Sequence, residues 1–165
     1  FPKYNLAWRN DLSYKGIHLG FLFSGRIGGV CYSATQANLD LYGVSEDSAA
    51  ARDAGGVLVN GREWMDAQKW YQAIGSQSGL PLYYTYSATN FRLQELSIGY
   101  TLPRKLFRDK CSLTISAVGH NLWMIYCKAP FDPEAIASTG NNYQGIDYFM
   151  MPSLRSMGFN IKLDF

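Results

Sequence analysis

The final stretch of the chain, Met157-Gly158-Phe159-Asn160-Ile161-Lys162-Leu163-Asp164-Phe165, decides the fold. Its odd-numbered residues are all apolar and its even-numbered residues are glycine or polar, so as an extended strand it has one apolar face and one polar face. A tilted strand of this length spans a bilayer, and transmembrane β-barrel chains end on such strands. The edge strand of a soluble β-sandwich has the same alternation, so the rest of the chain has to separate the two interpretations.

The composition permits either interpretation. With 165 residues the chain is long enough to fold as one soluble domain. Fifteen Lys and Arg against 13 Asp and Glu leave a net charge of +2, which, without a long basic run, argues against a nucleic-acid partner. Twelve Tyr, nine Phe and four Trp accompany 16 Gly, a profile that barrels share with carbohydrate-binding surfaces. No apolar run approaches the roughly 18 residues of a transmembrane helix.

The same alternation recurs in four further segments. The five predicted strands cover residues 3–14, 17–27, 89–102, 110–127 and 153–165. Short turns follow the first and third strands, whereas long loops, residues 28–88 and 128–152, follow the second and fourth. An antiparallel meander with these connections has both long loops at one end, as outer-membrane barrels do. The pattern therefore predicts an all-β transmembrane barrel segment.

Local signals refine this prediction. The alternation slips by one residue near Gln94, which indicates a β-bulge. In the first long loop, helical spacing begins at Ala34 and Gly43 stops it, and Ser45 is placed to cap a second helix that runs through Asp53. A stripe of apolar residues at intervals of three and four predicts a third helix from about Glu63 to Ile74, with members Trp64, Ala67, Tyr71 and Ile74.

The predicted strands are too few to form a complete barrel. The smallest membrane barrels have about eight strands, and every strand edge must be paired in lipid. The chain is therefore predicted to be part of a larger barrel. Its first residues, Phe1-Pro2-Lys3-Tyr4, lead straight into a strand pattern without a signal peptide, which indicates a processed N-terminus or a piece of a longer chain.

One segment closely resembles a known family. It is Asn90-Phe91-Arg92-Leu93-Gln94-Glu95-Leu96-Ser97-Ile98-Gly99-Tyr100-Thr101-Leu102-Pro103, which is similar to a segment near the end of SusC/RagA-type TonB-linked outer-membrane transporters. Further matches follow in the same order as in the family. No single motif is very specific for the family, but their order along the chain is. They are Val118-Gly119-His120-Asn121-Leu122, Phe131-Asp132-Pro133-Glu134, and Gly145-Ile146-Asp147 through Pro152 and Arg155, preceded by Gly28-Gly29, Leu41-Tyr42-Gly43-Val44-Ser45, Ala51-Arg52-Asp53 and Val59-Asn60-Gly61.

The resemblance implies the C-terminal five strands of a roughly 22-stranded barrel, a size class with a plugged lumen. It implies a cofactor-free importer of oligosaccharides or peptides in the bacterial outer membrane. A SusD-like surface lipoprotein would act as a lid, and the TonB complex would act through a plug and N-terminal part that lie outside this segment. Phe165 would be the signal read by the barrel-assembly machinery, and the last strand would pair with the first strand of the rest of the same barrel.

Few residues suggest catalysis or metal binding. Asp132 and Glu134 flank a proline in one turn, which favours turn chemistry and loop packing over a catalytic pair or a calcium site. His18 and His120 lie on different strands without a metal-ligand pattern. The three cysteines are expected to be free, and a third hypothesis, an outer-membrane hydrolase, lacks a Ser-His-carboxylate pattern.

The aromatic residues of the long loops are the candidate contact sites. They would pack the loops together, meet the lid protein, or stack on a ligand, and these alternatives remain open. The set comprises Trp64, Trp70, Tyr71, Tyr83, Tyr84 and Tyr86 in the first loop and Tyr143, Tyr148 and Phe149 in the second. Trp8, Tyr14, Tyr100 and Trp123 are expected in girdles that face lipid. The rival to the transporter hypothesis is a soluble β-sandwich that binds carbohydrate.

Overall fold

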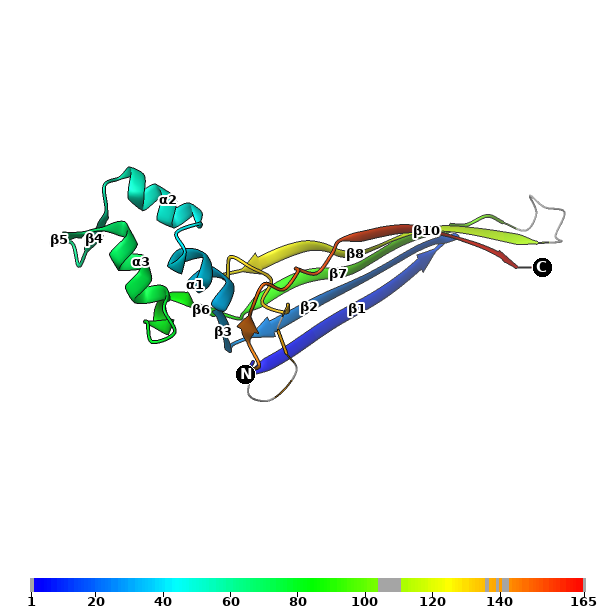
Figure 1. The fold of residues 1–165 in the computed structure, drawn as a ribbon. Helices are drawn as coiled ribbons and strands as arrows, with labels where there is room; N and C mark the ends of the chain where they lie inside the picture. Colours follow the sequence, from blue (N-terminus) through cyan, green and yellow to red (C-terminus); the bar gives the residue numbers. More distant parts are fainter. Residues whose placement is uncertain (1, 104–110, 136, 139, 141–142, 165) are drawn as a thin grey trace. The chain divides into compact units, whose positions relative to one another are not determined.

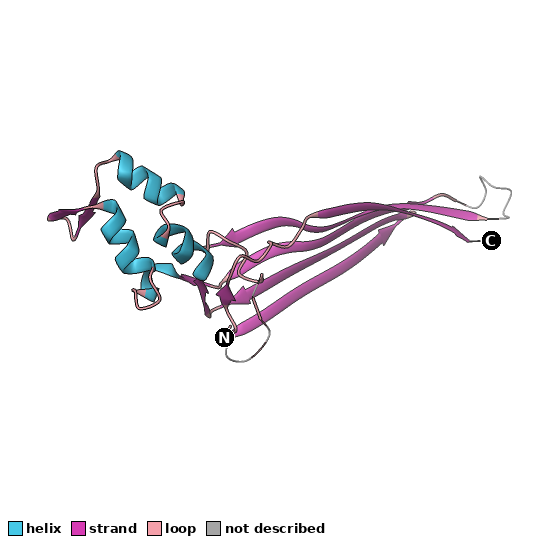
Figure 2. Ribbon diagram, in the orientation of Figure 1, coloured by secondary structure: helices cyan, strands magenta, loops and turns pink. Residues whose placement is uncertain are grey.

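The structure, a computed structural model, describes residues 2–103, 111–135, 137–138, 140 and 143–164. The chain folds into two compact units. The first, which we call the sheet unit, comprises Phe1–Gly29, Ala88–Asp132 and Pro152–Phe165. The second, which we call the loop unit, comprises Val30–Ser87 and Pro133–Met151. The helices of the described residues all belong to the loop unit (Figure 2).

The sheet unit is built on one antiparallel sheet (Figure 1). In spatial order its described strands are β1 (Tyr4–Tyr14), β2 (Ile17–Ile27), β7 (Asn90–Thr101), β8 (Ser112–Cys127) and β10 (Ser156–Asp164). Each begins and ends within a few residues of the range that its alternation predicts. Lys15 and Gly16 connect β1 to β2 with φ of 47° and 86°, and a two-residue type I′ hairpin turn requires positive φ at both positions.

The strand register places the apolar side chains on one face of the sheet. Residues directly opposite each other in neighbouring strands project from the same face. One such row crosses all five strands as Ile161, Ile115, Tyr100, Ile17 and Tyr14. The next row on this face is also apolar throughout, with Phe159, Ala117, Ile98, Leu19 and Leu12. The row between them carries Asn160, Ser116, Gly99, His18 and Ser13 on the other face.

The predicted bulge near Gln94 is confirmed. Leu22 pairs with Glu95 and Phe23 pairs with Leu93, so Gln94 is the extra residue of β7 in this pairing. A bulge residue shifts the alternation by one position. As a result Leu93 returns to the apolar face of the sheet, and Arg92 is carried to the polar face.

The described part of the loop unit contains three α-helices, each capped by the side chain that precedes it. Ser33 accepts a hydrogen bond at the start of α1 (Ala34–Leu41), Ser45 at the start of α2 (Glu46–Asp53), and Asp66 at the start of α3 (Ala67–Gly75). These oxygens satisfy backbone N–H groups that the first helical turn leaves without a partner. The predicted cap at Ser45 and the predicted end at Asp53 are confirmed.

The prediction for the third helix was wrong at its start. Residues Glu63–Met65 form β5, which pairs with β4 (Val57–Val59) in a small hairpin, and the Asp66 carboxylate accepts from Lys69 N at 3.1 Å. The apolar spacing of Trp64 with Ala67 is therefore fortuitous. Because an N-cap residue ends the preceding extended segment, Asp66 is the local signal that marks the true start.

The core of the loop unit lies where α1 and α3 approach each other. Ala37, Ile74 and Tyr84 are buried, and Tyr32, Trp70 and Tyr71 pack against them. Tyr84 belongs to a short 3₁₀-helix, η1 (Pro81–Tyr84). A small three-stranded sheet completes the described part of the unit, in the spatial order β6 (Thr85–Ser87), β3 (Val30–Ser33) and β9 (Ile146–Asp147). Its β9 strand ties the second long loop to the first.

Candidate functional site

The apolar face of the sheet unit is exposed even in the middle of the sheet. Ile98, on the central strand β7, is 52% exposed, and Ile115 on the neighbouring β8 is 45% exposed. Exposure at an edge strand reflects an absent neighbour, but Ile98 and Ile115 each have strands on both sides. A contiguous exposed apolar surface marks an interaction with lipid or protein. The whole face is therefore a candidate functional surface.

Aromatic rings reinforce this face. Trp8 stacks on Phe23 with ring centroids 6.0 Å apart and meets Phe21 edge-on at 5.4 Å. Phe91 stacks on Phe23 in turn, at 6.1 Å. The Phe91 ring also covers Gly25, where an added Cβ would lie 2.6 Å from a ring carbon, so the glycine is required for this cross-strand contact. Trp8 thus lies mid-strand within an aromatic cluster.

The opposite face of the sheet is polar and internally hydrogen-bonded. His18 Nε2 lies 2.9 Å from Thr101 Oγ1, which lies 2.9 Å from Thr114 Oγ1, so one chain of side chains links β2, β7 and β8. Arg9 and Asp11 on β1 form an exposed ion pair at 3.0 Å. Such a face suits water rather than hydrocarbon.

A buried ion pair lies on the polar side of the sheet unit. Arg92 Nη2 and Asp132 Oδ1 are 2.9 Å apart, and the two side chains are only 5% and 8% exposed. The Arg92 guanidinium also donates from Nη1 to Ser153 Oγ at 3.3 Å. Ser153 in turn donates its backbone N–H and its hydroxyl to Asp132 Oδ2. We call Arg92, Asp132 and Ser153 the stem cluster.

The stem cluster joins the two ends of the second long loop to the sheet. Asp132 directly precedes Pro133 and Ser153 directly follows Pro152, so they lie at the two ends of the second long loop. Arg92 belongs to β7. The turn role predicted for Asp132 thus involves a partner that sequence reasoning missed. In the sequence, Arg92 between Phe91 and Leu93 follows the ordinary strand alternation, so no local signal pointed to this pairing.

Polar side chains are also buried within the loop unit. Asp40, 4% exposed, accepts hydrogen bonds from the Tyr84 hydroxyl at 2.9 Å and from Gln36 Nε2 at 3.0 Å. Burial first, and then the hydrogen bond to Asp40, raise the pKa of Tyr84 well above its usual value. Ser33 Oγ donates to the buried Asp147 at 2.9 Å, which links the N-cap residue of α1 to β9. Fully satisfied buried networks of this kind rigidify a unit.

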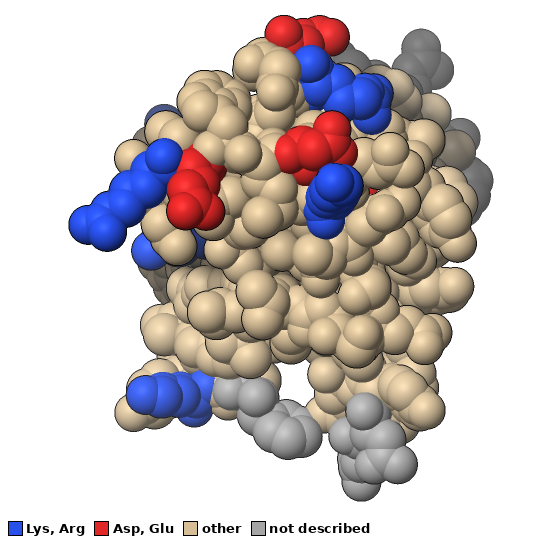
Figure 3. All heavy atoms as spheres, turned by 60° about the vertical axis from the view of Figure 1, so that its left-hand side comes forward, with Lys and Arg blue, Asp and Glu red and all other residues tan. Residues whose placement is uncertain are grey.

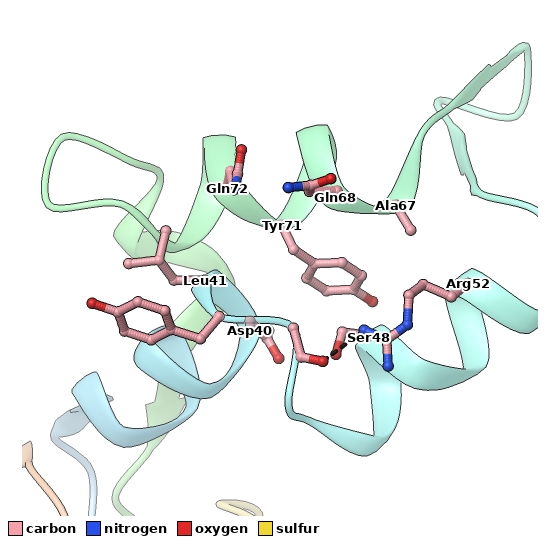
Figure 4. A pocket seen from close by; sticks show the side chains of 10 residues that line it. Asp40, Leu41, Ser48, Arg52, Ala67, Gln68, Tyr71 and Gln72 are labelled. Atoms are coloured by element: carbon pink, nitrogen blue, oxygen red, sulfur yellow. Dashed lines mark hydrogen bonds between the residues drawn. The ribbon is translucent and has the colours of Figure 1, made fainter.

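A cavity of about 280 Å³ opens among the helices α1, α2 and α3 (Figure 4). Tyr71 points from α3 into the space between the helices, and Gln68 and Gln72 lie on the same helix beside it. Arg52 of α2 lines the cavity and donates from Nη1 to the carbonyl of Gly43 at 2.6 Å. Asp40 and Ser48 line it from α1 and α2.

The structure divides the candidate aromatic residues into two groups. Tyr84 is 2% exposed, and Trp70 and Tyr71 pack against the same core, so these rings hold the loop unit together. Tyr86 lies half-buried on β6. Exposed rings form the other group: Trp64 at 65%, Tyr143 at 61%, Tyr148 and Phe149 at 56% each, and Tyr83 at 51%, the last meeting Trp70 edge-on.

Comparisons with known proteins agree with this geometry. No family model matches the chain. The chain is 28% identical over 171 residues to TonB-dependent receptor P3 of Formosa agariphila, an alignment that covers 98% of the chain and 16% of that receptor. Nearly the whole chain is therefore similar in sequence to part of a TonB-dependent receptor.

Two solved structures are similar to the chain in fold. The RagAB peptide importer in its open-open state matches 99% of the chain with a TM-score of 0.66 and 16% identity, and the closed-closed state matches with a TM-score of 0.62 and 16% identity. The chain spans about a sixth of the length of these relatives, 16% of the receptor and 17% of the importer chain. The proteins that it resembles are a receptor and an importer rather than enzymes.

The sandwich hypothesis is not favoured by these observations. A β-sandwich buries one face of each sheet against a second sheet. In the described part of the sheet unit there is one sheet, and its apolar face is exposed from edge to edge. The match to the importer covers nearly the whole chain, so the fold is similar to that of the matching segment of the importer.

Neither the charges on the face shown in Figure 3 nor the potential metal ligands among the described residues mark a further site. On the face shown in Figure 3, acidic and basic side chains lie beside one another rather than in a patch of one sign. Within the described residues no group of three or more His, Cys, Asp and Glu side chains could hold a metal ion. The helices in that part of the chain are all too short or too polar to cross a membrane. Phe165, the expected assembly signal, lies outside the described residues.

Proposed function

We propose that this chain forms the last five strands of a roughly 22-stranded outer-membrane barrel in a TonB-dependent importer. The single observation that carries the proposal is the apolar face, whose cross-strand rows extend over all five strands. The polar face would line the interior of the barrel, and β10 would pair along its free edge with the first strand of the complete barrel. Similarity to a TonB-dependent receptor along 98% of the chain supports this assignment.

The dimensions of β1 support a lipid-facing role. Tyr4 and Tyr14, 64% and 69% exposed, lie at the two ends of this strand and on its apolar face. Ten residue steps at ~3.4 Å each, tilted by ~45°, give a height of roughly 24 Å. The apolar band of a membrane barrel is about 25 Å tall and is bounded by aromatic girdles. Tyr4 and Tyr14 therefore suit the two interfaces, and Trp8 suits the hydrocarbon between them.

The similarity of the fold to the RagAB peptide importer supports a proposal for the partners and the cargo. We assign to the whole protein the import of oligosaccharides or peptides, TonB as the energy source, and a SusD-like surface lipoprotein as the lid. The loop unit would contribute to the external vestibule. Its exposed rings, Trp64, Tyr83, Tyr143 and Tyr148, are the residues that suit contact with the lid or the cargo.

Arginine substitution on the two faces tests the membrane assignment. In the full-length protein, Ile161→Arg places a charge on the apolar face, where it should cost up to about 2–4 kcal/mol, the value at the bilayer midplane. Asn160→Arg, one residue away on the polar face, is the matched control. Outer-membrane yield and retention of the folded, heat-modifiable form on electrophoresis should fall for the first variant alone.

Two outcomes would contradict the proposal. Equal yields of folded protein for Ile161→Arg and Asn160→Arg would show that the two faces do not differ in their exposure to lipid. A 165-residue chain that folds cooperatively in buffer without detergent would instead support the soluble carbohydrate-binding alternative.

A further inference from the structure

Strand β8 continues past the point where its neighbour β10 begins (Figure 1). The cross-strand row at which β10 begins consists of Arg9, Leu22, Glu95, His120 and Ser156. The other four strands extend further, to the row of Asn5, Arg26, Asn90 and Cys127. We call Asn121–Cys127, the part of β8 beyond β10, the overhang. Among the described residues, β7 pairs with the overhang on one side and no strand pairs with it on the other.

The chain that leads into β10 does not pair with this open edge. The stem cluster holds Ser153 at Arg92, whose side chain lies on the polar face. Pro152 lacks a backbone N–H, and proline is disfavoured in the interior of a sheet for that reason. The Asn121 amide donates to the carbonyl of Leu154 at 3.2 Å, which fixes the approach to β10 beside the start of the overhang. The neighbour of the overhang therefore has to come from another segment.

The overhang is part of the apolar face of the sheet. Trp123 lies opposite Leu93, and Tyr126 lies opposite Phe91. Trp123 is 62% exposed and Tyr126 is 42% exposed. The function proposed above assigns this face to lipid, and in lipid the backbone N–H and C=O groups of a strand edge have to be paired. An unpaired edge along the overhang is thus incompatible with the membrane-embedded protein.

A bulge bends β8 at the place where the overhang begins. Asn121 and Leu122 of β8 lie opposite the single residue Gln94 of β7, and Asn121 has a φ of 50°. A bulge bends the strand that carries the extra residue. The overhang therefore changes direction beside Ser156, the first residue of β10. A bend at this position allows β8 to approach the strand on the far side of β10 once β10 has ended.

We propose that the first strand of the complete barrel pairs with β10 as far as Ser156 and with the overhang of β8 beyond it. This inference rests on the barrel proposed above, in which the first strand already follows the adjoining edge. Neighbouring strands lie about 4.8 Å apart, so the two strands that flank β10 are separated by roughly 10 Å and close by one strand spacing where β10 ends. A strand from a separate protein would leave the edge open to lipid whenever that protein is absent.

The test is site-specific photo-crosslinking of the full-length protein in native outer membranes. The photoreactive residue p-benzoylphenylalanine replaces Trp123 in the overhang or Ile161 in β10, both on the apolar face, and mass spectrometry identifies the linked peptides. Tyr126 is a second overhang position, for the case that the label at Trp123 prevents assembly. The matched control is Ile98 on β7, which has strands of the same sheet on both sides.

The labels at Trp123 and Tyr126 should link to the first barrel strand of the same molecule, as the label at Ile161 should, and this link should be absent for Ile98. Links to the first strand from Ile161 alone would overturn the inference and leave the barrel proposal standing. The same holds if the overhang labels link to a separate protein. If the labels at Ile161 and in the overhang all fail to reach the first strand, the barrel closure proposed above fails and this inference fails with it.

Discussion

Replacing Asp132 with alanine should destabilise the sheet unit far more than the loss of an exposed ion pair. In the stem cluster, the Arg92 side chain is 5% exposed and pairs with Asp132 at 2.9 Å. Removing the carboxylate breaks this ion pair while the guanidinium stays buried. That loss costs about 3–5 kcal/mol in proteins, or roughly two to three and a half powers of ten in the folding equilibrium.

Two comparisons separate the buried charge from other effects. Arg92→Met combined with Asp132→Leu removes both charges and fills the space with apolar groups, so it should cost much less than Asp132→Ala. Asp11→Ala removes the exposed partner of Arg9, whose pair has side chains 58% and 63% exposed. Solvent screening limits such exposed pairs to about 0–1 kcal/mol.

The assay uses the full-length protein in detergent micelles. Electrophoresis measures unfolding in urea as the loss of the folded form. Chymotrypsin digestion measures how accessible the loop between Asp132 and Ser153 becomes, because this loop contains Tyr143 and Tyr148. Asp132→Ala should unfold at lower urea and be cut faster in this loop. A loss of stability no larger than that of Asp11→Ala would refute the reasoning, because the guanidinium would then be solvated in the complete protein.

Two further predictions concern the loop unit and the end of the chain. The raised pKa of Tyr84 favours its neutral form, so its contribution to stability should be fully present below about pH 10 and be lost as the pH rises from there toward the folded-state pKa. Tyr84→Phe should lower stability by about 0.5–1.5 kcal/mol at neutral pH. It should also reduce the loss of stability at alkaline pH, as measured by proteolysis of the loop between about pH 8 and 11. A loss of stability as steep as in the unaltered protein would contradict this. Deleting Phe165 should reduce the amount of assembled barrel and leave uptake per assembled molecule unchanged, and an equal reduction in both would count against an assembly signal.

Much of the fold can be predicted from the sequence, because the two-residue period of a strand is a local property of the chain. The five long strands and the bulge at Gln94 follow from the alternation alone. The helix beginning at Ser45 follows from its cap. The start of α3 does not follow from the sequence pattern. Neither do the strands β3, β6 and β9, since elements of two to four residues carry no period to recognise.

The candidate sites are less predictable than the strands. Aromatic composition drew attention to the loop, but a buried ring such as Tyr84 and an exposed ring such as Trp64 look the same in a sequence. Their difference comes from packing against Ala37 and Ile74, which lie many residues away. The cavity likewise requires three helices to meet.

The sequence by itself determined the two faces of the terminal strand, Ser156–Asp164, because alternate side chains must project to opposite sides of any extended chain. The tertiary structure decided which residues complete those faces. Pairing placed Ile161 in one row with Ile115, Tyr100, Ile17 and Tyr14. It also brought Arg92 to Asp132 across 40 positions of sequence. Such contacts depend on long-range register, which no local pattern encodes.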